Sequence, residues 1–272
     1  MNRTEDPGQW PHVAQQWLQL GAPLRPCAED IRTAGGMIER WLGTRAARYL
    51  ILGVTPEYHA LATADGGDVR AIDRTAEMIR YVWPGDAALA RVGDWRDMPW
   101  RQPTFDIALC DGGLQLVGYP DGVRDVAAGL HRALAPGGLF IVRLFTPPDA
   151  PETPEQVLQD LLAGGIASLN VLKLRLGMAM QADAGSGTAL DDVWNRLHAA
   201  AGPWPELAER LGWPLAHLQA IDAYRGSPAR MHYFTAEQAV GLFEHHGFRH
   251  LETARGDYTL GRQCPTLCFR RL

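Results

Sequence analysis

The sequence predicts an α/β protein: a doubly wound sheet of seven strands, with an N-terminal helical segment and a helical cap inserted after the fifth strand. Three observations lead to this prediction. Strand-like and helical patterns alternate between residues 46 and 145, residues 155 to 230 contain only helical patterns, and strand-like patterns then return. Such alternation is typical of a parallel sheet covered by helices on both faces.

Length, composition and charge narrow the class of protein. The chain has 272 residues, of which 46% are hydrophobic and 21% charged, as in one large globular domain or a domain with an insertion. The net charge of −5 gives no overall excess of basic residues, which a nucleic-acid-binding protein would normally have. No apolar run approaches the roughly 18 residues that span a bilayer, and the acids and prolines of MNRTEDPGQWPHV do not suit a signal peptide. We therefore expect a cytoplasmic protein that binds neither nucleic acid nor membrane.

The N-terminal segment, residues 1 to 45, has helical spacing of its apolar residues. Trp10, Val13 and Trp17 recur at helix-like intervals, and a second helix is expected from Glu29 to Leu42 after a break at GAPLRP.

The core, residues 46 to 145, supplies five strand candidates. The segments are YLILG, DVRAID, ALARVGD, FDIALCD and GLFIVRLF. Helical patterns lie between them, and VRDVAAGLHRALAPGG reads as a helix stopped by its Pro-Gly-Gly.

Prolines in TPPDAPETPE mark the start of the cap, residues 146 to 232, which has helix-like segments and no convincing strand. Residues 233 to 272 then give an amphipathic helix, TAEQAVGLFEHHGF, and two last strands, FRHLETARGDY and TLCFRRL. The cysteines lack zinc-like pairing, so buried thiols are expected and no metal site. Cys264 and Cys268, if both lie on a strand, point to one face.

Gly53 ends the first strand where a nucleotide-binding turn would begin, but the turn lacks further glycines. Pro56 removes an N–H group that a pyrophosphate would need, and Glu57 would repel a diphosphate. Thr55, Pro56 and Glu57 make a good helix start, as in an ordinary strand–helix turn. A cofactor with a pyrophosphate is therefore disfavoured.

Acids at two later strand ends favour a bound nucleoside. Asp73 ends the strand DVRAID twenty residues after Gly53, where a carboxylate can accept both ribose hydroxyls. In GDWRDMPW, Asp94 can accept from the exocyclic amine of adenine while Trp95 lies on the base. A turn aspartate and a buried tryptophan are the structural alternatives. The order of Gly53, Asp73 and Asp94 over three successive strand ends favours binding.

Residues 46 to 145 resemble the core of class I, Rossmann-like S-adenosylmethionine (SAM) dependent methyltransferases. YLILG is similar to the first motif of that family, AIDRTAEMI to the second, GDWRDMPW to the third and FDIALCDGGLQLVGYPDG to the fourth. HRALAPGGLFIVRLF resembles the "L-x-P-G-G" element before the fifth strand. The resemblance implies SAM as cofactor and S-adenosylhomocysteine (SAH) as product.

The resemblance also implies where the cofactor binds. Asp111, with Gly112 beside it, would lie near the methionine moiety or the methyl group. The full set of expected cofactor residues is Gly53, Val54, Glu57, Asp73, Arg74, Met78, Gly93, Asp94, Trp95, Asp111 and Gly112.

The first motif departs from the family pattern, which has an acid two residues before the first glycine and two further glycines. Those positions are Ile51, Thr55 and Glu57. SAM has no phosphates, and Glu57 would favour its cationic sulfonium and ammonium groups. The methionine carboxylate would then need another partner, for which Arg74 and Arg25 are candidates.

Acceptor recognition is assigned to the cap, because insertions of this family commonly cover the site. The candidate residues are His232 as a base, Tyr224, Arg225 and Arg143, with Asn170, Lys173, Arg175 and Asp222 as further cap residues. Solvated or packing roles are the alternatives for each of them.

The expected function is methyl transfer to oxygen or nitrogen of a small molecule, since CDGG lacks the N-P-P-[YF] type signature for planar amino groups. A non-catalytic SAM- or SAH-binding partner protein and a nicotinamide oxidoreductase stay as alternatives. The sequence leaves the acceptor and the oligomeric state open.

Overall fold

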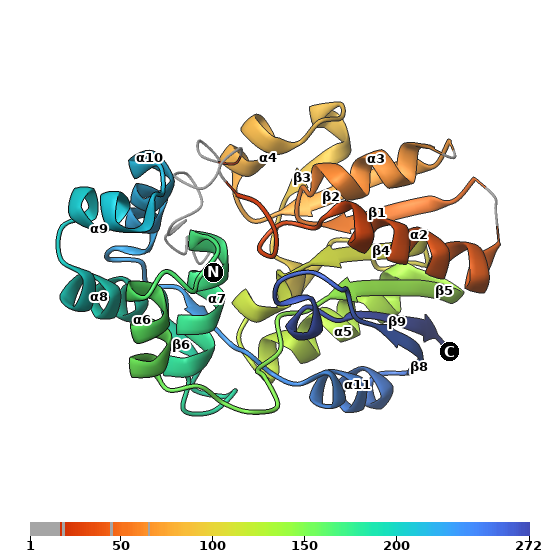
Figure 1. The fold of residues 1–272 in the computed structure, drawn as a ribbon. Helices are drawn as coiled ribbons and strands as arrows, with labels where there is room; N and C mark the ends of the chain where they lie inside the picture. The colour runs from red at the N-terminus through yellow and green to blue at the C-terminus, as the bar shows by residue number, and fades with distance from the viewer. Residues whose placement is uncertain (1–16, 18–19, 44–45, 65) are drawn as a thin grey trace.

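The computed structural model describes residues 17, 20–43, 46–64 and 66–272. A sheet flanked by helices forms one part of the molecule, and a group of helices lies beside it (Figure 1). The expected helical positions Trp10 and Val13 lie outside the described residues.

The main sheet has seven strands in the order β3-β2-β1-β4-β5-β9-β8. Strands β1 to β5 are parallel, and β9 and β8 add an antiparallel edge. Their bounds are β1 (Arg48–Leu52), β2 (Asp68–Asp73), β3 (Ala90–Val92), β4 (Phe105–Asp111), β5 (Leu134–Arg143), β8 (Phe248–Ala254) and β9 (Thr266–Arg271). This arrangement confirms the predicted fold class.

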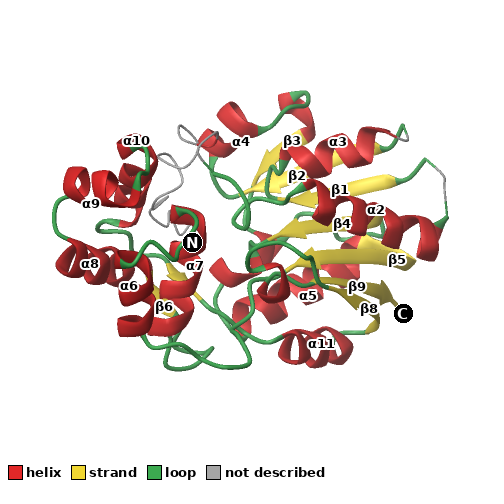
Figure 2. Cartoon of the chain, viewed as in Figure 1, coloured by secondary structure: helices red, strands yellow, loops and turns green. Residues whose placement is uncertain are grey.

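Helices cover both faces of the sheet (Figure 2). One face carries α2 (Ala28–Leu42), α3 (Pro56–Ala64) and α4 (Ala76–Val82), and the other carries α5 (Asp121–Ala133) and α11 (Ala236–His245). Successive strand residues point to opposite faces of the sheet. Tyr49 and Ile51 therefore pack in the hydrophobic cluster under α2, α3 and α4, while Leu50 and Leu52 pack in the cluster under α5 and α11. Burial on both faces explains why β1 is apolar without alternation.

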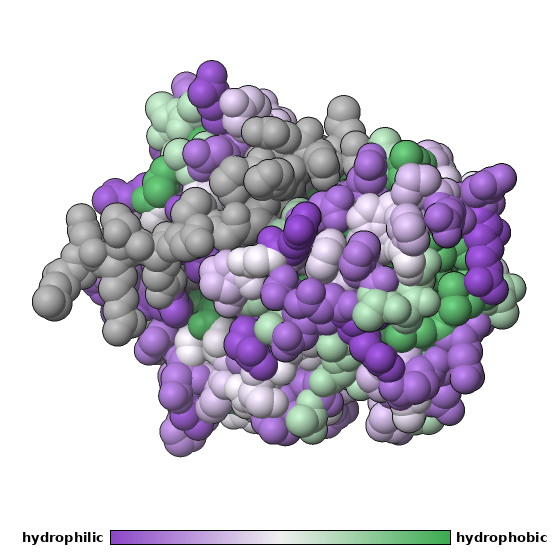
Figure 3. Space-filling view, turned by 90° about the vertical axis from the view of Figure 1, so that its left-hand side faces the viewer, coloured by the Kyte–Doolittle hydropathy of each residue, from purple (hydrophilic) through white to green (hydrophobic). Residues whose placement is uncertain are grey.

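The helical group after β5 is the cap. Its helices are α6 (Pro154–Leu162), α7 (Leu169–Met180), α8 (Leu190–Ala201), α9 (Trp204–Leu211) and α10 (Leu215–Gln219). The cap also contains the 3₁₀ turn η5 (Ala220–Tyr224), and the other short 3₁₀ turns are η2 (Ala87–Leu89), η3 (Trp95–Asp97), η4 (Leu114–Leu116) and η6 (Gly261–Gln263). The cap has its own hydrophobic core, which includes Leu172, Leu197 and Ile221. Its outward face is mostly hydrophilic in the described part, with apolar residues in small separate groups (Figure 3).

Three local expectations need correction. The cap contains a two-stranded sheet, in which β6 (Thr188–Ala189) pairs with β7 (Arg230–Met231) although the sequence showed no strand pattern. The Pro-Gly-Gly segment does not stop α5 but lies inside β5, because α5 ends at Ala133 and β5 begins at Leu134. Cys264 and Cys268 are both buried, but Cys264 follows η6 and only Cys268 lies on a strand.

No helix of the described residues is long and apolar enough to cross a membrane.

Candidate functional site

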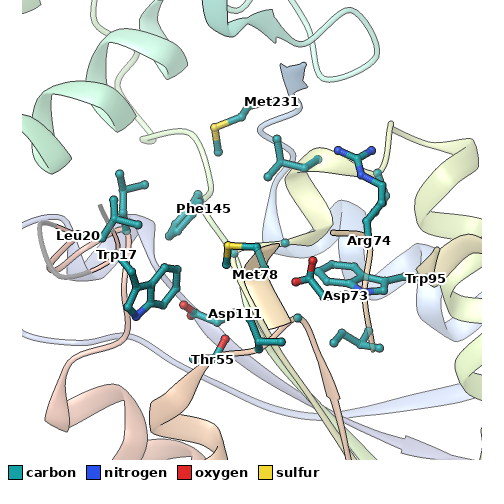
Figure 4. A pocket seen from close by; sticks show the side chains of 18 of the residues that line it. Trp17, Leu20, Thr55, Asp73, Arg74, Met78, Trp95, Asp111, Phe145 and Met231 are labelled. Atoms are coloured by element: carbon teal, nitrogen blue, oxygen red, sulfur yellow. The ribbon is translucent and has the colours of Figure 1, made fainter. Parts of the chain in front are cut away.

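A pocket opens at the carboxyl ends of β1, β2 and β4, where ligands of open α/β sheets bind. Residues of the sheet, the cap and the segment before α2 line it together (Figure 4). The sheet side consists of Leu52, Gly53, Val54, Thr55, Asp73, Arg74, Met78, Asp94, Trp95, Arg96, Asp111, Gly112 and Gly113. The other side consists of Trp17, Leu20, Leu24, Leu116, Val117, Phe145, Lys173, Leu190, Tyr224 and Met231.

The turn after β1 brings backbone close to the pocket. Gly53 has a φ of +93°, a conformation that favours glycine, and its N–H donates to the Ile72 carbonyl at 2.8 Å. Helix α3 begins at Pro56, as the helix-start pattern predicts.

Glu57, an expected cofactor residue, is not among the residues that line the pocket. Its carboxylate forms a salt bridge with Arg25, and its Oε2 atom is buried without a hydrogen-bond partner among the described residues. Arg25, which also lies over the Trp17 ring, is therefore not free to bind a methionine carboxylate.

Asp73 points into the pocket from the end of β2 (Figure 4). Its Oδ1 atom accepts from the backbone N–H and the hydroxyl of Thr75, at 2.9 and 3.0 Å. Its Oδ2 atom lies 3.9 Å from where a Cβ on Gly53 would stand. Burial raises the pKa of Asp73 despite these hydrogen bonds. Arg74 and Met78 line the pocket next to it.

Trp95 lines the pocket next to the turn after β1. Its indole N–H donates to the Ile72 carbonyl at 2.8 Å, and its ring packs against Gly53 and Gly113. A Cβ on Gly113 would stand 2.3 Å from this ring, so only glycine fits there.

Asp94, the residue before Trp95, accepts from the backbone N–H of Arg96 at 2.8 Å and pairs with its guanidinium. Burial favours a higher pKa for Asp94, but the hydrogen bonds and charge of Arg96 outweigh it and lower the pKa. Gly93, an expected cofactor residue, is not among the residues that line the pocket. A Cβ on Gly93 would stand 2.9 Å from the end of the Ile72 side chain, so the glycine leaves room for that side chain.

Asp111 and Gly112 line the pocket from the end of β4. Gly112 has a φ of +60°, and a Cβ there would stand 2.6 Å from the Phe145 ring. Asp111 accepts from the Nε and Nη2 atoms of Arg143, at 2.5 and 3.1 Å.

Arg143, a candidate for the acceptor site, has a fully buried side chain and is not among the residues that line the pocket. It also contacts Asp30 and donates to the Pro23 carbonyl and the Tyr258 hydroxyl. Burial opposes its charge, but the carboxylates of Asp111 and Asp30 outweigh burial and raise its pKa. Arg143 therefore fixes Asp111 and ties the segment before α2 to the sheet.

The cap places only some of its candidate residues at the pocket. Tyr224 and Lys173 line it. His232 does not, because its Nδ1 atom lies 2.8 Å from the Ala184 carbonyl and its backbone N–H donates to Gln115. Arg225 is exposed and lies over the Trp194 ring, away from the pocket lining.

Two further cap candidates have structural partners. Arg175 forms salt bridges with Glu152 and Asp160. Asp222 accepts from the indole N–H groups of Trp194 and Trp204, at 2.8 and 2.9 Å.

Several pocket residues carry no sequence signal of their own. Trp17, Leu20 and Leu24 come from the N-terminal segment, and Phe145, Leu190 and Met231 come from the cap and its entry. Each is an apolar residue of ordinary helical or strand spacing, so only its three-dimensional position reveals it. The described residues contain no group of three or more His, Cys, Asp or Glu that could hold a metal ion.

Comparisons with known proteins agree with this geometry. Residues 51–142, which run from β1 to β5, match a family model described as a methyltransferase domain. No curated protein sequence shows significant similarity to the chain.

Solved structures share the fold at low identity. The CcbJ methyltransferase from Streptomyces caelestis has a TM-score of 0.57 and 13% identity, with 98% of this chain and 99% of that chain covered. The N-methyltransferase NodS from Bradyrhizobium japonicum, in complex with SAH, has a TM-score of 0.52 and 11% identity, covering 96% and 97%. A putative zinc-dependent alcohol dehydrogenase from Rhodobacter sphaeroides has a TM-score of 0.62 and 13% identity, covering 97% of each chain. At these identities the structures show the fold alone.

The sheet order, the strand-end pocket and the domain match together define a class I, Rossmann-like methyltransferase. Residues 51–142 are thus similar to a methyltransferase domain, a class of domain whose cofactor is S-adenosylmethionine.

Proposed function

We propose that the protein transfers a methyl group from SAM to an oxygen or nitrogen atom of a small molecule. The observation that carries this proposal is that Asp73, Asp111 and the strand-end glycines line a pocket whose other side comes from the cap, the segment before α2 and the region of η4. A cofactor side and an acceptor side thus meet in one cavity.

The sheet side suits a nucleoside without phosphates. Asp73 presents a carboxylate beside Gly53, where it can accept ribose hydroxyls, and Trp95 offers an aromatic surface. Pro56 provides no N–H to a pyrophosphate, which disfavours a nicotinamide dinucleotide.

Arg74, unlike Arg25, lines the pocket and is the better candidate for the methionine carboxylate. Asp111 places a negative charge in the pocket, where it can offset the cationic end of the cofactor. Bound SAM would supply an electrophilic methyl group on a sulfonium.

The protein's own contribution is positioning. Arg143 holds Asp111 through two hydrogen bonds, and the indole hydrogen bond to Ile72 holds Trp95. Methyl transfer is an in-line displacement, so holding the reactants in one orientation supplies much of the rate. A general base is needed only where the acceptor must lose a proton.

The acceptor side supports a small molecule. Its described walls are mostly apolar side chains from three separate segments of the chain, which is the usual lining of a small-molecule site.

The test is calorimetric titration of cofactor-stripped protein with SAM, SAH and NAD, using wild type, Asp73→Ala and Asp86→Ala. Asp86 is a matched control because it caps η2 and does not line the pocket. We expect SAM and SAH to bind wild type and Asp86→Ala, at least tenfold weaker binding by Asp73→Ala, and no heat from NAD. Absence of SAM and SAH binding by wild type would reject the proposal.

A second assay separates catalysis from binding alone. Release of SAH from SAM in the presence of a panel of hydroxyl and amine acceptors would support methyl transfer. Tight SAM binding with no turnover of any acceptor would favour the alternative, a SAM- or SAH-binding partner protein with this fold.

A further inference from the structure

Lys173 is a buried cation on the acceptor side of the pocket. It is the only lysine of the chain, and it lies on α7, the cap helix drawn nearest the sheet in Figure 2. Lys173 is among the residues that line the pocket, although it is only 5% exposed. A buried lysine ammonium group normally has a carboxylate partner.

The described residues give Lys173 no such partner. Its Nζ atom donates to the Ala220 carbonyl at 3.2 Å and lies 4.8 Å from the centre of the Tyr224 ring. A lysine ammonium has three N–H donors, so these contacts leave donor capacity unused and the charge uncompensated. Burial is the cause that lowers the pKa of Lys173 to about 8, which still leaves the side chain mostly protonated at neutral pH.

Other buried or half-buried cations of the protein differ in this respect. Arg143 faces Asp111 and Asp30, and Arg25 pairs with Glu57. The three pocket carboxylates have other partners: Asp111 pairs with Arg143, Asp94 pairs with Arg96, and Asp73 accepts from Thr75. Among the described residues, Lys173 is thus a cation without an anionic partner, in a pocket whose remaining cap-side walls are apolar.

We propose that Lys173 and Tyr224 form the acceptor subsite and that they select a methyl acceptor carrying a carboxylate on an apolar body. The carboxylate would accept from the free N–H groups of Lys173. The apolar body would pack against Tyr224 and its neighbours Phe145, Leu190 and Met231. A single lysine without an arginine fork suits a monoanion better than a phosphate dianion. This substrate class rests on the proposed function.

The only lysine allows a direct test by NMR. Lysine labelled with ¹³C at Cε gives one such signal, which reports on Lys173 alone. We would titrate SAH-saturated and SAH-free protein with benzoate, phenylacetate, indole-3-acetate and octanoate, and with the corresponding primary amides. We expect at least one carboxylate to shift the signal and raise the pKa of Lys173, and its amide to do neither.

Two variants separate recognition from general packing. Lys173→Met should weaken binding of that carboxylate at least tenfold while leaving SAH affinity unchanged. Arg175→Met removes a cation from the same helix that is held by Glu152 and Asp160 outside the pocket, and it should bind the carboxylate as wild type does.

Three results would overturn the inference: no carboxylate moves the lysine signal, an amide binds as well as its acid, or Lys173→Met binds the acid normally. Failure of the proposed function is a separate outcome. It would appear as absent SAH binding by wild type, whereas the response of the lysine signal to carboxylates in SAH-free protein still decides this inference.

Discussion

The Nε atom of Arg143 donates to Oδ1 of Asp111 at 2.5 Å, and the two side chains are at most 5% exposed. Arg143 ends β5 and Asp111 ends β4, so the pair joins the ends of two neighbouring strands, of which β4 ends at the pocket. Asp111 can therefore present its charge to a ligand in a fixed position.

Arg143→Met should destabilise the protein by about 3–5 kcal/mol, because it leaves the carboxylates of Asp111 and Asp30 buried without their cation. Urea unfolding at neutral pH measures the loss. Arg124→Met, which breaks an exposed pair with Asp121, should cost less than about 1 kcal/mol. A loss for Arg143→Met as small as that for Arg124→Met would contradict the role assigned to the buried pair.

The sequence predicts the sheet well because its strands have a local signature. Strands such as β1 and β4 are short, apolar and separated by helices, since both of their faces are buried. Helix α2 is equally clear from the spacing of Ile31, Met37 and Ile38. The prediction that the Pro-Gly-Gly segment ends α5 is wrong. Pro136 and Gly137 are residues that normally end a helix or strand, yet here they lie in the first part of β5.

The site is less predictable because its contacts are long-range. Asp73 follows from its place at a strand end, whereas nothing local distinguishes Arg143 from a surface arginine before its pairing with Asp111 is known. The same holds for Glu57, whose partner Arg25 lies in another segment. Lys173 has the sequence context of an ordinary helical lysine, and only the fold shows that it is buried.

The affinity for SAH should fall at mildly acidic pH because the Asp73 carboxylate becomes protonated. Ribose hydroxyls donate to a carboxylate, so binding requires the ionised form. Burial raises the pKa of Asp73 above its usual value of 3.8, and the loss should therefore begin at a higher pH than for an exposed aspartate. Titrations between pH 4 and 8 measure it. Asp73→Asn should bind weakly with a flatter pH profile, and a wild-type affinity constant over this range would count against the assignment.

Gly113→Ala should disturb the pocket at Trp95. The backbone of Gly113 has a φ of −84°, which any residue adopts, so the effect comes from the added Cβ 2.3 Å from the Trp95 ring. We expect a loss of about 1–3 kcal/mol in unfolding free energy and weaker SAH binding, because Trp95 must move.

Gly36→Ala is the matched change, since Gly36 lies within α2 and its Cβ would meet only Arg40 at 3.9 Å. It should stabilise the protein by up to about 1 kcal/mol and leave SAH affinity unchanged. If Gly113→Ala and Gly36→Ala changed SAH affinity equally, the proposed contact between the Trp95 ring and the bound ligand would be contradicted.

Lys173→Met should stabilise the free protein at neutral pH, which is the opposite of the usual effect of changing a buried residue. Burial lowers the pKa of Lys173 from 10.5 to about 8, so the charged side chain costs the folded state up to about 3 kcal/mol below pH 8. Between pH 8 and 10.5 the unfolded chain holds a proton that the folded chain has lost, and the stability of wild type rises with pH there relative to the variant. The stability advantage of Lys173→Met over wild type should therefore be greatest below pH 8 and shrink as pH rises through this interval.

Urea unfolding at a series of pH values measures this difference in stability. The control, Arg175→Met, should lower stability because it breaks two salt bridges. Lys173→Met could instead be less stable than wild type by the same amount at every pH. That result would mean that Lys173 stabilises the fold through its hydrogen bond to the Ala220 carbonyl and does not bind a ligand.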